Sequence, residues 1–304
     1  MKILVSDPIA REGLDLLRQQ AQVDVWTKLS PDELLTIIGG YDALIVRSRT
    51  KVTAEVIEAG ERLRVIGRAG VGLDNIDLKA AQRRGITVVN SPDPVSAAVA
   101  EHTIALMLAL ARHIPQADAS LRRREWLKTQ FRGVGVEGKT LGVIGLGRIG
   151  AAVAQRAQGL GMEVIAHDPY LSAGQIRERG ATPASLEELL EKADFVTVHV
   201  PLTRETQGLI GARQFSMMKP TARLINCARG GMVDEEALVS ALEEGRLAGA
   251  AFDVFEKEPP LDSPLLANDK VVLTPHLGSS TVEAQSGVAV AIAQKVLVAL
   301  QEEG

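Results

Sequence analysis

Short apolar runs alternate with longer amphipathic stretches over most of this chain. In the first 90 residues, the short runs are rich in β-branched residues and are bounded by Gly, Pro, Asp or Asn, which is the pattern of buried strands. Because the stretches between them have the length of helices, this part of the chain has a βαβ pattern. The predicted strands are Ile3 to Val5, Val23 to Trp26, Ala43 to Val46, Arg64 to Ile66 and Thr87 to Val89.

The alternation begins again after Lys139. Stretches such as Ser185 to Lys192 and Asp234 to Glu244 have helical patterns. Two series of this kind predict an α/β protein with two doubly wound parallel-sheet (Rossmann-like) domains, in which ligands bind at the carboxyl ends of the strands. The buried parallel strands predicted here are Leu141 to Ile144, Glu163 to Ala166, Phe195 to Val200, Arg223 to Ile225, Ala250 to Phe252 and Val271 to Leu273.

Two predicted helices stand apart from these series. The stretch from Pro94 to His113 is apolar on nearly all sides, so we expect it to be buried against protein, either as a link between two domains or packed between subunits. The second series has no strand left to pair with the last helix, from about Thr281 to Gln301, so we expect this helix to return to the first domain. Its apolar positions are four residues apart and share one face: Val288, Ile292, Val296 and Leu300.

Composition places the chain among globular proteins. Its 304 residues suggest two domains, and 46% hydrophobic with 24% charged residues argue against a disordered or low-complexity protein. The 34 Lys and Arg against 38 Asp and Glu leave a net charge of −4 without a basic stripe, so no nucleic-acid partner is expected.

Cysteine use and the N-terminus bear on the compartment. A single cysteine, Cys227, excludes an intramolecular disulfide and a cysteine-rich zinc site, which agrees with a reducing compartment. Asp7 and Pro8 interrupt the apolar segment that a signal peptide needs. The longest apolar run, Ile104 to Ala111, is far shorter than the ~18 residues of a membrane-spanning helix. We therefore expect a soluble cytoplasmic protein without a membrane partner.

A glycine-rich turn follows the strand predicted at Leu141 to Ile144. Gly145, Gly147 and Gly150 have the G-x-G-x-x-G spacing and lead directly into a helical stretch. Gly145 permits the tight turn, Gly147 lets a diphosphate approach the backbone, and Gly150 lets helix and strand pack closely. The motif alone is a weak signal, but here it has its strand, its helix and an acid, Asp168, 18 residues after Gly150. Together these features predict a dinucleotide site.

Asp168 indicates which dinucleotide binds. A carboxylate at this position accepts hydrogen bonds from the adenosine ribose and repels a 2′-phosphate. Its neighbours His167, Pro169 and Tyr170 supply no arginine that could hold a phosphate. NAD is therefore the expected cofactor.

Polar residues that follow strands of the second series should converge near the nicotinamide end of the cofactor. His276 is the candidate base, because removing hydride from a carbon that bears a hydroxyl needs one and His suits that role near neutral pH. Glu258 would orient the ring and stabilise its protonated form, and Arg229 would pair with a substrate carboxylate and polarise the adjacent oxygen. A His after a strand or an acid beside prolines is also often structural, so spacing alone leaves both interpretations open.

The remaining histidines and the cysteine are interpreted as structural. Cys227 is expected to be a small buried residue that touches the cofactor, because no adjacent base is evident. The four histidines are His102 and His113 on the apolar helix, His167 beside Asp168, and His199 at the end of a strand.

Several segments, in the same order, resemble those of the D-isomer-specific 2-hydroxyacid dehydrogenases, and the resemblance covers almost the whole chain. The segments are Gly67 to Asp77, Ala100 to Thr103, the glycine-rich turn, His199 to Thr203, Asn226 to Gly231 with Val233 and Asp234, and Thr274 to Thr281.

This resemblance implies the roles proposed for Arg229, Glu258 and His276. It also implies a discontinuous substrate-binding domain, residues 1–92 plus 281–304, an NAD-binding Rossmann domain, residues 93–280, and an active-site cleft between them. With the glycines of the turn included, the residues expected at the cofactor are Gly145, Gly147, Arg148, Ile149, Gly150, Asp168, Val200, Pro201, Cys227, Ala228, Asp253 and Gly278.

Substrate recognition is expected in the first domain. Arg47 and Arg68 follow predicted strand ends, where guanidinium groups could hold a phosphate, although either could instead be a solvated surface or interdomain ion pair. The resemblance implies NAD-dependent oxidation of 3-phospho-D-glycerate to 3-phosphohydroxypyruvate, the first step of serine synthesis. The residues assigned to this substrate are Arg47, Ser48, Arg68, Gly70, Val71 and, from a neighbouring subunit, Lys128, where some relatives have Arg.

Two other functions stay open. One is a reductase of glyoxylate, hydroxypyruvate or another unphosphorylated 2-oxo acid, and the other is a dinucleotide-sensing binding protein. A homodimer is expected, with pairing into a tetramer left open. Longer members of the family continue into domains that sense serine, whereas this sequence ends at Gly304 as a short form or as part of a longer chain, so serine feedback is not assumed.

Overall fold

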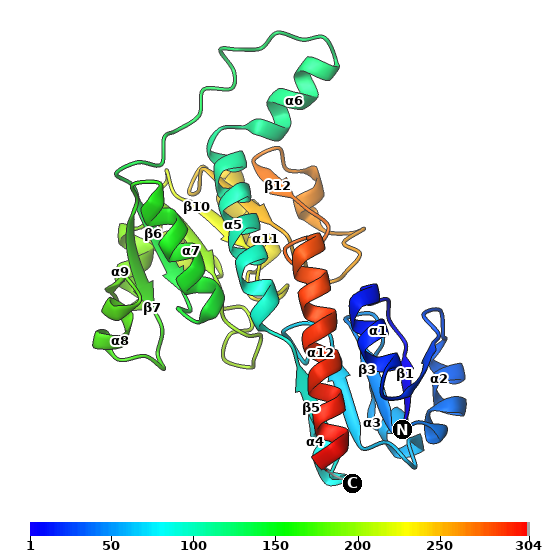
Figure 1. Cartoon of the computed structure of the whole chain (residues 1–304). Helices are drawn as coiled ribbons and strands as arrows, with labels where there is room; N and C mark the ends of the chain where they lie inside the picture. Colours follow the sequence, from blue (N-terminus) through cyan, green and yellow to red (C-terminus); the bar gives the residue numbers. More distant parts are fainter. Residues whose placement is uncertain (303–304) are drawn as a thin grey trace. The chain divides into compact units, whose positions relative to one another are not determined.

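The computed structural model describes residues 1–302, which fold into two compact units (Figure 1). Unit 1 comprises Met1–Val95 and the segment from Ser279 onward, and unit 2 comprises Ser96–Gly278. The boundaries expected after residues 92 and 280 lie within three residues of these positions. Each unit is a parallel sheet with helices, which confirms the predicted fold class.

The sheet of unit 1 has the strand order β2-β1-β3-β4-β5, and neighbouring strands are parallel. The order reverses between β1 and β3, so the carboxyl ends of these strands mark the place where ligands bind in such sheets. The strands are β1 (Lys2–Val5), β2 (Gln22–Val25), β3 (Ala43–Val46), β4 (Val65–Arg68) and β5 (Thr87–Asn90), and the helices are α1 (Arg11–Arg18), α2 (Pro31–Ile37), η1 (Ile38–Gly40), α3 (Ala54–Ala59), α4 (Leu78–Arg83) and η2 (Asp93–Val95).

The last helix, α12 (Val282–Glu302), packs on unit 1. A Cβ on Gly13 of α1 would lie 2.4 Å from the backbone oxygen of Ala289, and a Cβ on Gly67 of β4 would lie 2.5 Å from Val296. The helix therefore approaches α1 and the sheet so closely that small residues are required. The apolar face predicted from the sequence is buried: Val288, Ile292, Val296 and Leu300.

The sheet of unit 2 has the order β12-β11-β10-β9-β6-β7-β8, again with parallel neighbours. Its order reverses between β6 and β9. The strands are β6 (Thr140–Ile144), β7 (Glu163–His167), β8 (Thr182–Pro183), β9 (Phe195–Val198), β10 (Arg223–Asn226), β11 (Gly249–Phe252) and β12 (Val271–Leu273), and the helices are α5 (Ser96–Ala111), α6 (Ile114–Arg122), α7 (Arg148–Gly159), α8 (Ala173–Glu178), α9 (Leu186–Lys192), α10 (Ala212–Met217), α11 (Glu235–Glu243) and η3 (Pro264–Ala267).

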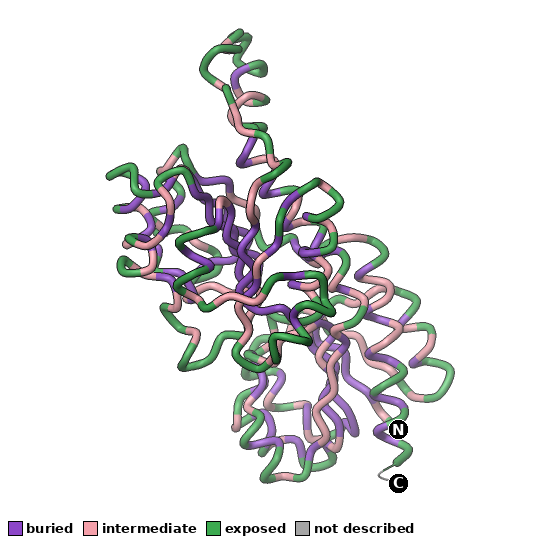
Figure 2. Tube along the Cα trace, turned by 90° about the vertical axis from the view of Figure 1, so that its left-hand side faces the viewer, coloured by how far each residue is buried: buried purple, intermediate pink, exposed green. Residues whose placement is uncertain are grey.

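Helices bury both faces of this second sheet, so its strands carry buried apolar residues on both faces. Successive side chains alternate between the faces: Ile225 joins the cluster that includes Leu106 of α5, and Leu224 joins the cluster that includes Leu189 of α9. Figure 2 shows buried stretches in the interior of each unit and more exposed stretches around them. Two helices, residues 93–111 and α12, are long and apolar enough to cross a membrane, but about half of each is buried within the chain, as in core helices.

Among the elements that differ from the sequence prediction, two do so for a clear local reason. The strand expected from Phe195 to Val200 ends at Val198, because His199 makes one last backbone bond to Ile144 and Pro201 has no N–H to continue the pairing. The helix expected from Pro94 to His113 is a 3-10 turn followed by α5, and it stops at Ala111. His113, with a φ of 53°, leaves the helix in the left-handed region.

Candidate active site

The glycine-rich turn lies where the strand order of unit 2 reverses. Gly145 follows β6 with a φ of 88°, which L side chains rarely adopt. A Cβ on Gly145 would lie 2.6 Å from Val200 and 2.8 Å from the backbone oxygen of His199, so the turn packs directly against the segment after β9. This is the crevice in which sheets of this order bind dinucleotides.

The other two glycines of the motif form the start of α7. A Cβ on Gly150 would lie 2.1 Å from the backbone oxygen of Gly145, so only glycine allows this helix to approach the turn. At Gly147, by contrast, a Cβ would meet no heavy atom of residues 1–302 within 4 Å. The N-terminus of α7 therefore faces open space that a diphosphate can enter, and the residues present are suited to hold a dinucleotide.

Asp168 directly follows β7, beside the same turn. Its Oδ2 accepts a hydrogen bond from the backbone N–H of Leu146 (2.9 Å), and its Oδ1 accepts one from Tyr170 N–H (3.0 Å). The guanidinium of Arg179, just after α8, donates to the backbone oxygen of Leu146. The sequence prediction missed this arginine because it considered only the neighbours of Asp168 along the chain, and a side chain from the next helix gives no local signal.

His276 and Glu258 form a hydrogen-bonded pair beyond the end of β12. His276 Nδ1 lies 2.8 Å from Glu258 Oε2 and 3.1 Å from Oε1, and the backbone N–H of Phe255 donates to Glu258 at 3.3 Å. Burial opposes ionisation of Glu258, but the hydrogen bond and charge of His276 and the Phe255 N–H outweigh it and hold the pKa of Glu258 below its ordinary value. The His276 side chain is 43% exposed, so a small molecule can reach the ring.

Asp253, which follows β11, holds the loop that carries His276. Its carboxylate accepts hydrogen bonds from the backbone N–H groups of Leu277 (2.7 Å) and Gly278 (2.8 Å), and its backbone oxygen accepts one from His276 N–H (2.8 Å). Burial opposes its ionisation, yet the bonds from His102, Thr274 and these two amides lower its pKa. A charged, buried carboxylate therefore fixes the backbone directly after His276 and the side chain of Thr274 before it.

Arg229 lies on the turn after β10, the next strand in the sheet. The Asn226 side chain shapes this turn: its Oδ1 accepts from Ala228 N–H (3.1 Å) and its Nδ2 donates to the backbone oxygen of Arg229 (2.9 Å). The Arg229 guanidinium donates to Ala228 O (2.7 Å) and is partly exposed. Adjacent strands β10, β11 and β12 thus carry Arg229, the loop of Glu258, and His276 to the same edge of the sheet.

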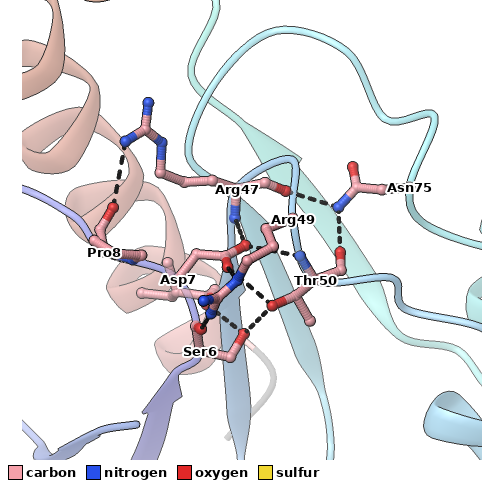
Figure 3. Close-up of polar contacts among 8 residues, drawn as sticks. Ser6, Asp7, Pro8, Arg47, Arg49, Thr50 and Asn75 are labelled. Atoms are coloured by element: carbon pink, nitrogen blue, oxygen red, sulfur yellow. Dashed lines mark hydrogen bonds and ion pairs between the residues drawn. The ribbon is translucent and has the colours of Figure 1, made fainter. Parts of the chain in front are cut away.

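The candidate substrate residues of unit 1 lie where its own strand order reverses. Asp7, buried after β1, accepts hydrogen bonds from Arg47 N–H (2.6 Å), Thr50 N–H (3.1 Å) and Thr50 Oγ1 (3.0 Å), all from the turn after β3. Asp7 also pairs with Arg49 (3.0 Å). In Figure 3 the Arg47 side chain extends away from Asp7 towards Pro8, whose carbonyl oxygen it meets at 3.4 Å. Asp7 therefore fixes this turn through the Arg47 backbone and leaves the Arg47 guanidinium apart from the carboxylate.

Arg68, the last residue of β4, lies close to Gly70, just after the strand. A Cβ on Gly70 would lie 1.8 Å from Nη1 of Arg68, so the guanidinium folds directly over the glycine. The N–H of Gly70 donates to Ser91 (3.2 Å), and Val71 O accepts from Asn90 (2.6 Å). Arg47 follows β3, and Arg68 ends the neighbouring strand β4, where it pairs with Val46.

The candidate residues are divided between the two units. Arg47, exposed Ser48, Arg68, Gly70 and Val71 belong to unit 1, and the proposed catalytic and cofactor residues belong to unit 2. Lys128 lies in neither group, because it is exposed on the long segment between α6 and β6 (Figure 1).

Two buried groups of unit 2, His199 and Cys227, are kept uncharged. Burial lowers the pKa of His199 to about 4, and its Nδ1 has no hydrogen-bond partner within residues 1–302, while Nε2 lies 2.9 Å from Thr197 Oγ1. Burial raises the pKa of the Cys227 thiol to about 12, against a hydrogen bond to Thr103 that lowers it. Cys227 is thus a buried thiol rather than a nucleophile.

Comparison with known proteins shows to which family this chain belongs. Residues 104–278 match the NAD binding domain of the D-isomer specific 2-hydroxyacid dehydrogenase family. This match covers more than half of the chain, and the chain belongs to that family.

Individual members of the family are similar to this chain over nearly its whole length. The chain is 52% identical over 295 residues to D-3-phosphoglycerate dehydrogenase of Synechocystis sp., covering 97% of this chain and 53% of the relative. It is 51% identical over 304 residues to D-3-phosphoglycerate dehydrogenase of Methanocaldococcus jannaschii, covering 100% and 58%. A glyoxylate reductase from Paecilomyes thermophila superposes with a TM-score of 0.92 at 30% identity, covering 100% of this chain and 96% of that one. The chain spans about half the length of the curated relatives it matches.

Proposed function

We propose that this chain oxidises 3-phospho-D-glycerate to 3-phosphohydroxypyruvate with NAD, the first step of L-serine biosynthesis. The observation that carries the proposal is the pair of His276 and Glu258, 2.8 Å apart, at the same sheet edge as Arg229 in an NAD binding domain. Relatives that are about 50% identical in sequence are named D-3-phosphoglycerate dehydrogenase.

His276 is suited to take the hydroxyl proton through one particular nitrogen. Its Nδ1 faces both oxygens of Glu258, which leaves Nε2 for the substrate. When Nε2 takes the proton, the ring becomes positive beside a carboxylate whose lowered pKa keeps it charged. Glu258 thus stabilises the protonated ring, which is also the acid needed for the reverse reaction.

NAD, when bound, supplies the oxidising power by accepting hydride from C2 of the substrate. The residues suited to hold it are the glycine-rich turn, with the open N-terminus of α7 for the diphosphate, and Asp168 for the adenosine ribose. Val200, Pro201, Cys227, Ala228, Asp253 and Gly278 remain proposed contacts of this cofactor.

Arginines supply the recognition of the substrate in this proposal. Arg229 would bind the carboxylate and polarise the C2 oxygen, because a guanidinium pairs with planar anions through two bonds. Arg47 and Arg68, on neighbouring strands of unit 1, would bind the phosphate, and the amides around Gly70 would support the carboxylate. The turn that Asp7 fixes gives Arg47 and Ser48 a rigid base.

A homodimer, in which Lys128 serves the neighbouring subunit, is part of the proposal. The apolar helix α5 is about half buried, against α7 and strands of its own unit, and its remaining surface is available for the subunit contact expected from the sequence. Exposed apolar side chains also occur on α6 and the segment after it, which extends from the rest of unit 2 (Figure 1). They are Ile114 (54% exposed), Leu121 (57%) and Trp126 (79%). Pairing of dimers into tetramers is open.

The cytoplasm is the proposed compartment. Cys227 is a buried free thiol, as expected of a protein kept in reducing surroundings.

The similarity to a glyoxylate reductase supports a second candidate, reduction of an unphosphorylated 2-oxo acid. The choice depends on the phosphate arginines, and is tested by comparing kcat/KM for 3-phosphohydroxypyruvate and hydroxypyruvate in wild type, Arg47→Gln and Arg68→Gln. Loss of at least about tenfold for the phosphorylated substrate alone supports the proposal, since one charged hydrogen bond contributes about 1.5 kcal/mol or more. Arg83→Gln, an exposed arginine of α4, is the matched control. Equal loss for both substrates would contradict a phosphate role.

A further inference from the structure

His102 makes a contact that the proposed reaction does not use directly. It lies on α5, and its Nε2 lies 3.0 Å from Thr274 Oγ1 and 3.2 Å from Asp253 Oδ1. It thereby joins a helix on one face of the sheet to residues that follow β11 and β12. The contact is partly buried, and Asp253 itself is 1% exposed.

The hydrogen positions in this cluster follow from the distances. The Thr274 hydroxyl lies 2.6 Å from Asp253 Oδ1, so its proton points to that carboxylate. Both groups next to His102 Nε2 therefore present only acceptor oxygens to it. Nε2 must carry a hydrogen, and His102 is a donor to this pair of oxygens in either protonation state.

The cluster ends on the loop that carries His276. The Asp253 carboxylate accepts bonds from four protein donors: His102, Thr274, and the N–H groups of Leu277 and Gly278. His276 N–H donates to the Asp253 backbone, and His276 itself has a φ of 55°, which a non-glycine residue adopts only when its surroundings hold it there. The orientation of Asp253 thus determines the backbone at His276.

We propose that His102 is a positioning residue for the reaction: by holding Asp253 and Thr274 from α5, it keeps the loop at 274–278 in the conformation that directs His276 towards Glu258 and the substrate. This inference rests on the proposed function for the role of His276. It assigns His102 no contact with the substrate.

The variants that test it are His102→Ala and His102→Gln. Alanine removes the donor, whereas glutamine carries an amide N–H at about the reach of Nε2 and can restore it. Glu101→Ala is the matched control, because Glu101 is the preceding residue of α5 and is exposed, with an ion pair to Arg156 (3.1 Å). Thermal unfolding shows whether each variant is folded.

In steady-state kinetics, His102→Ala is expected to lower kcat about tenfold or more, the effect of losing one charged hydrogen bond, with a smaller change in the KM for the hydroxy acid. His102→Gln should recover most of kcat, and Glu101→Ala should match wild type. The proposal is overturned if His102→Ala keeps wild-type kcat, or if His102→Gln loses as much as His102→Ala.

Hydrogen exchange separates this proposal from the proposed function. Amides of Leu277 and Gly278 should exchange faster in His102→Ala than in wild type, with unchanged exchange in β1 and β3 of unit 1. Unchanged exchange at 277 and 278 would overturn the positioning role even in an active enzyme. If wild type turns over none of the tested acids, the proposed function fails, and the exchange result still decides whether His102 holds the loop.

Discussion

The backbone of Gly230 lies directly against the carbonyl of Phe255. A Cβ on Gly230 would stand 1.8 Å from Phe255 O and 2.5 Å from Glu256 N, both backbone atoms that cannot move aside as a side chain can. The turn that carries Arg229 therefore rests on the loop that carries Glu258. Because Gly230 has no Cβ, the segments that carry Arg229 and Glu258, two of the three proposed catalytic residues, can pack against each other.

Gly230→Ala should accordingly separate these two segments. We expect a loss of stability of about 1–3 kcal/mol, the range of overpacked sites, together with a large fall in kcat. Gly135→Ala is the control, because a Cβ on Gly135 would meet no heavy atom of residues 1–302 within 4 Å. Thermal unfolding and steady-state kinetics of both variants check this, and a Gly230→Ala protein with wild-type kcat would show that the contact does not place Arg229 and Glu258.

Mutation of His276 should affect kcat and leave NAD binding nearly unchanged. His276→Ala removes the proposed base and should lower kcat by about 100-fold or more, the usual contribution of general acid–base catalysis, while the affinity for NAD stays nearly unchanged. Glu258→Gln should lower kcat less, because the ring keeps a hydrogen-bond partner but loses the charge that stabilises its protonated form. Kinetics and NAD titration test both variants. If His276→Ala weakens NAD binding as much as it lowers kcat, His276 is not the base.

Asp168 and Arg179 should together set the choice of dinucleotide. Asp168→Asn removes the charge that repels a 2′-phosphate while Arg179 remains beside Leu146, so kcat/KM for NADP relative to NAD should rise about tenfold. Adding Arg179→Gln should reverse part of this gain. The ratio is measured with both dinucleotides under one condition. An unchanged ratio in Asp168→Asn would mean that Asp168 does not discriminate between them.

His199 should make unfolding sensitive to acid. Its pKa is about 4 in the folded chain against about 6.5 in the unfolded chain, so below pH 6.5 the unfolded chain binds a proton that the folded one does not. The contribution of neutral His199 to the free energy of unfolding is complete above pH 6.5 and is lost as the pH falls towards 4. At pH 5 the loss is about 2 kcal/mol. Denaturant unfolding at pH 7.5 and 5 should show a smaller loss for His199→Gln. His113→Asn, which suits the left-handed φ of that residue, should lose as much as wild type. Equal losses in wild type and His199→Gln would contradict burial of a neutral His199.

The sequence predicted the strands and the dinucleotide turn well, because both depend on local patterns. β3 and β12 have the predicted bounds, and Gly145 and Gly150 make the close approaches that the motif requires. The short β8 was missed, because two residues, Thr182 and Pro183, carry no periodicity.

Contacts between distant segments could not be predicted from local sequence patterns. His102 was interpreted as structural, although a polar residue in so apolar a helix was a signal, and its partners, Asp253 and Thr274, come from two other strands. Asp7 is likewise separated by 40 residues from the backbone N–H of Arg47 that it holds. Such relationships depend on strand order, which the alternation of strands and helices leaves open.

The proposed oxidation is tested most directly by following NADH formation from NAD and 3-phospho-D-glycerate at mildly alkaline pH with the purified chain. The reverse reaction is measured alongside with 3-phosphohydroxypyruvate, hydroxypyruvate and glyoxylate. NADH formation, with a strong preference for the phosphorylated acid in reverse, is the predicted result. Preference for an unphosphorylated acid would contradict the proposed substrate. NAD binding without any turnover would contradict the proposal that this chain is an enzyme and would favour a dinucleotide sensor.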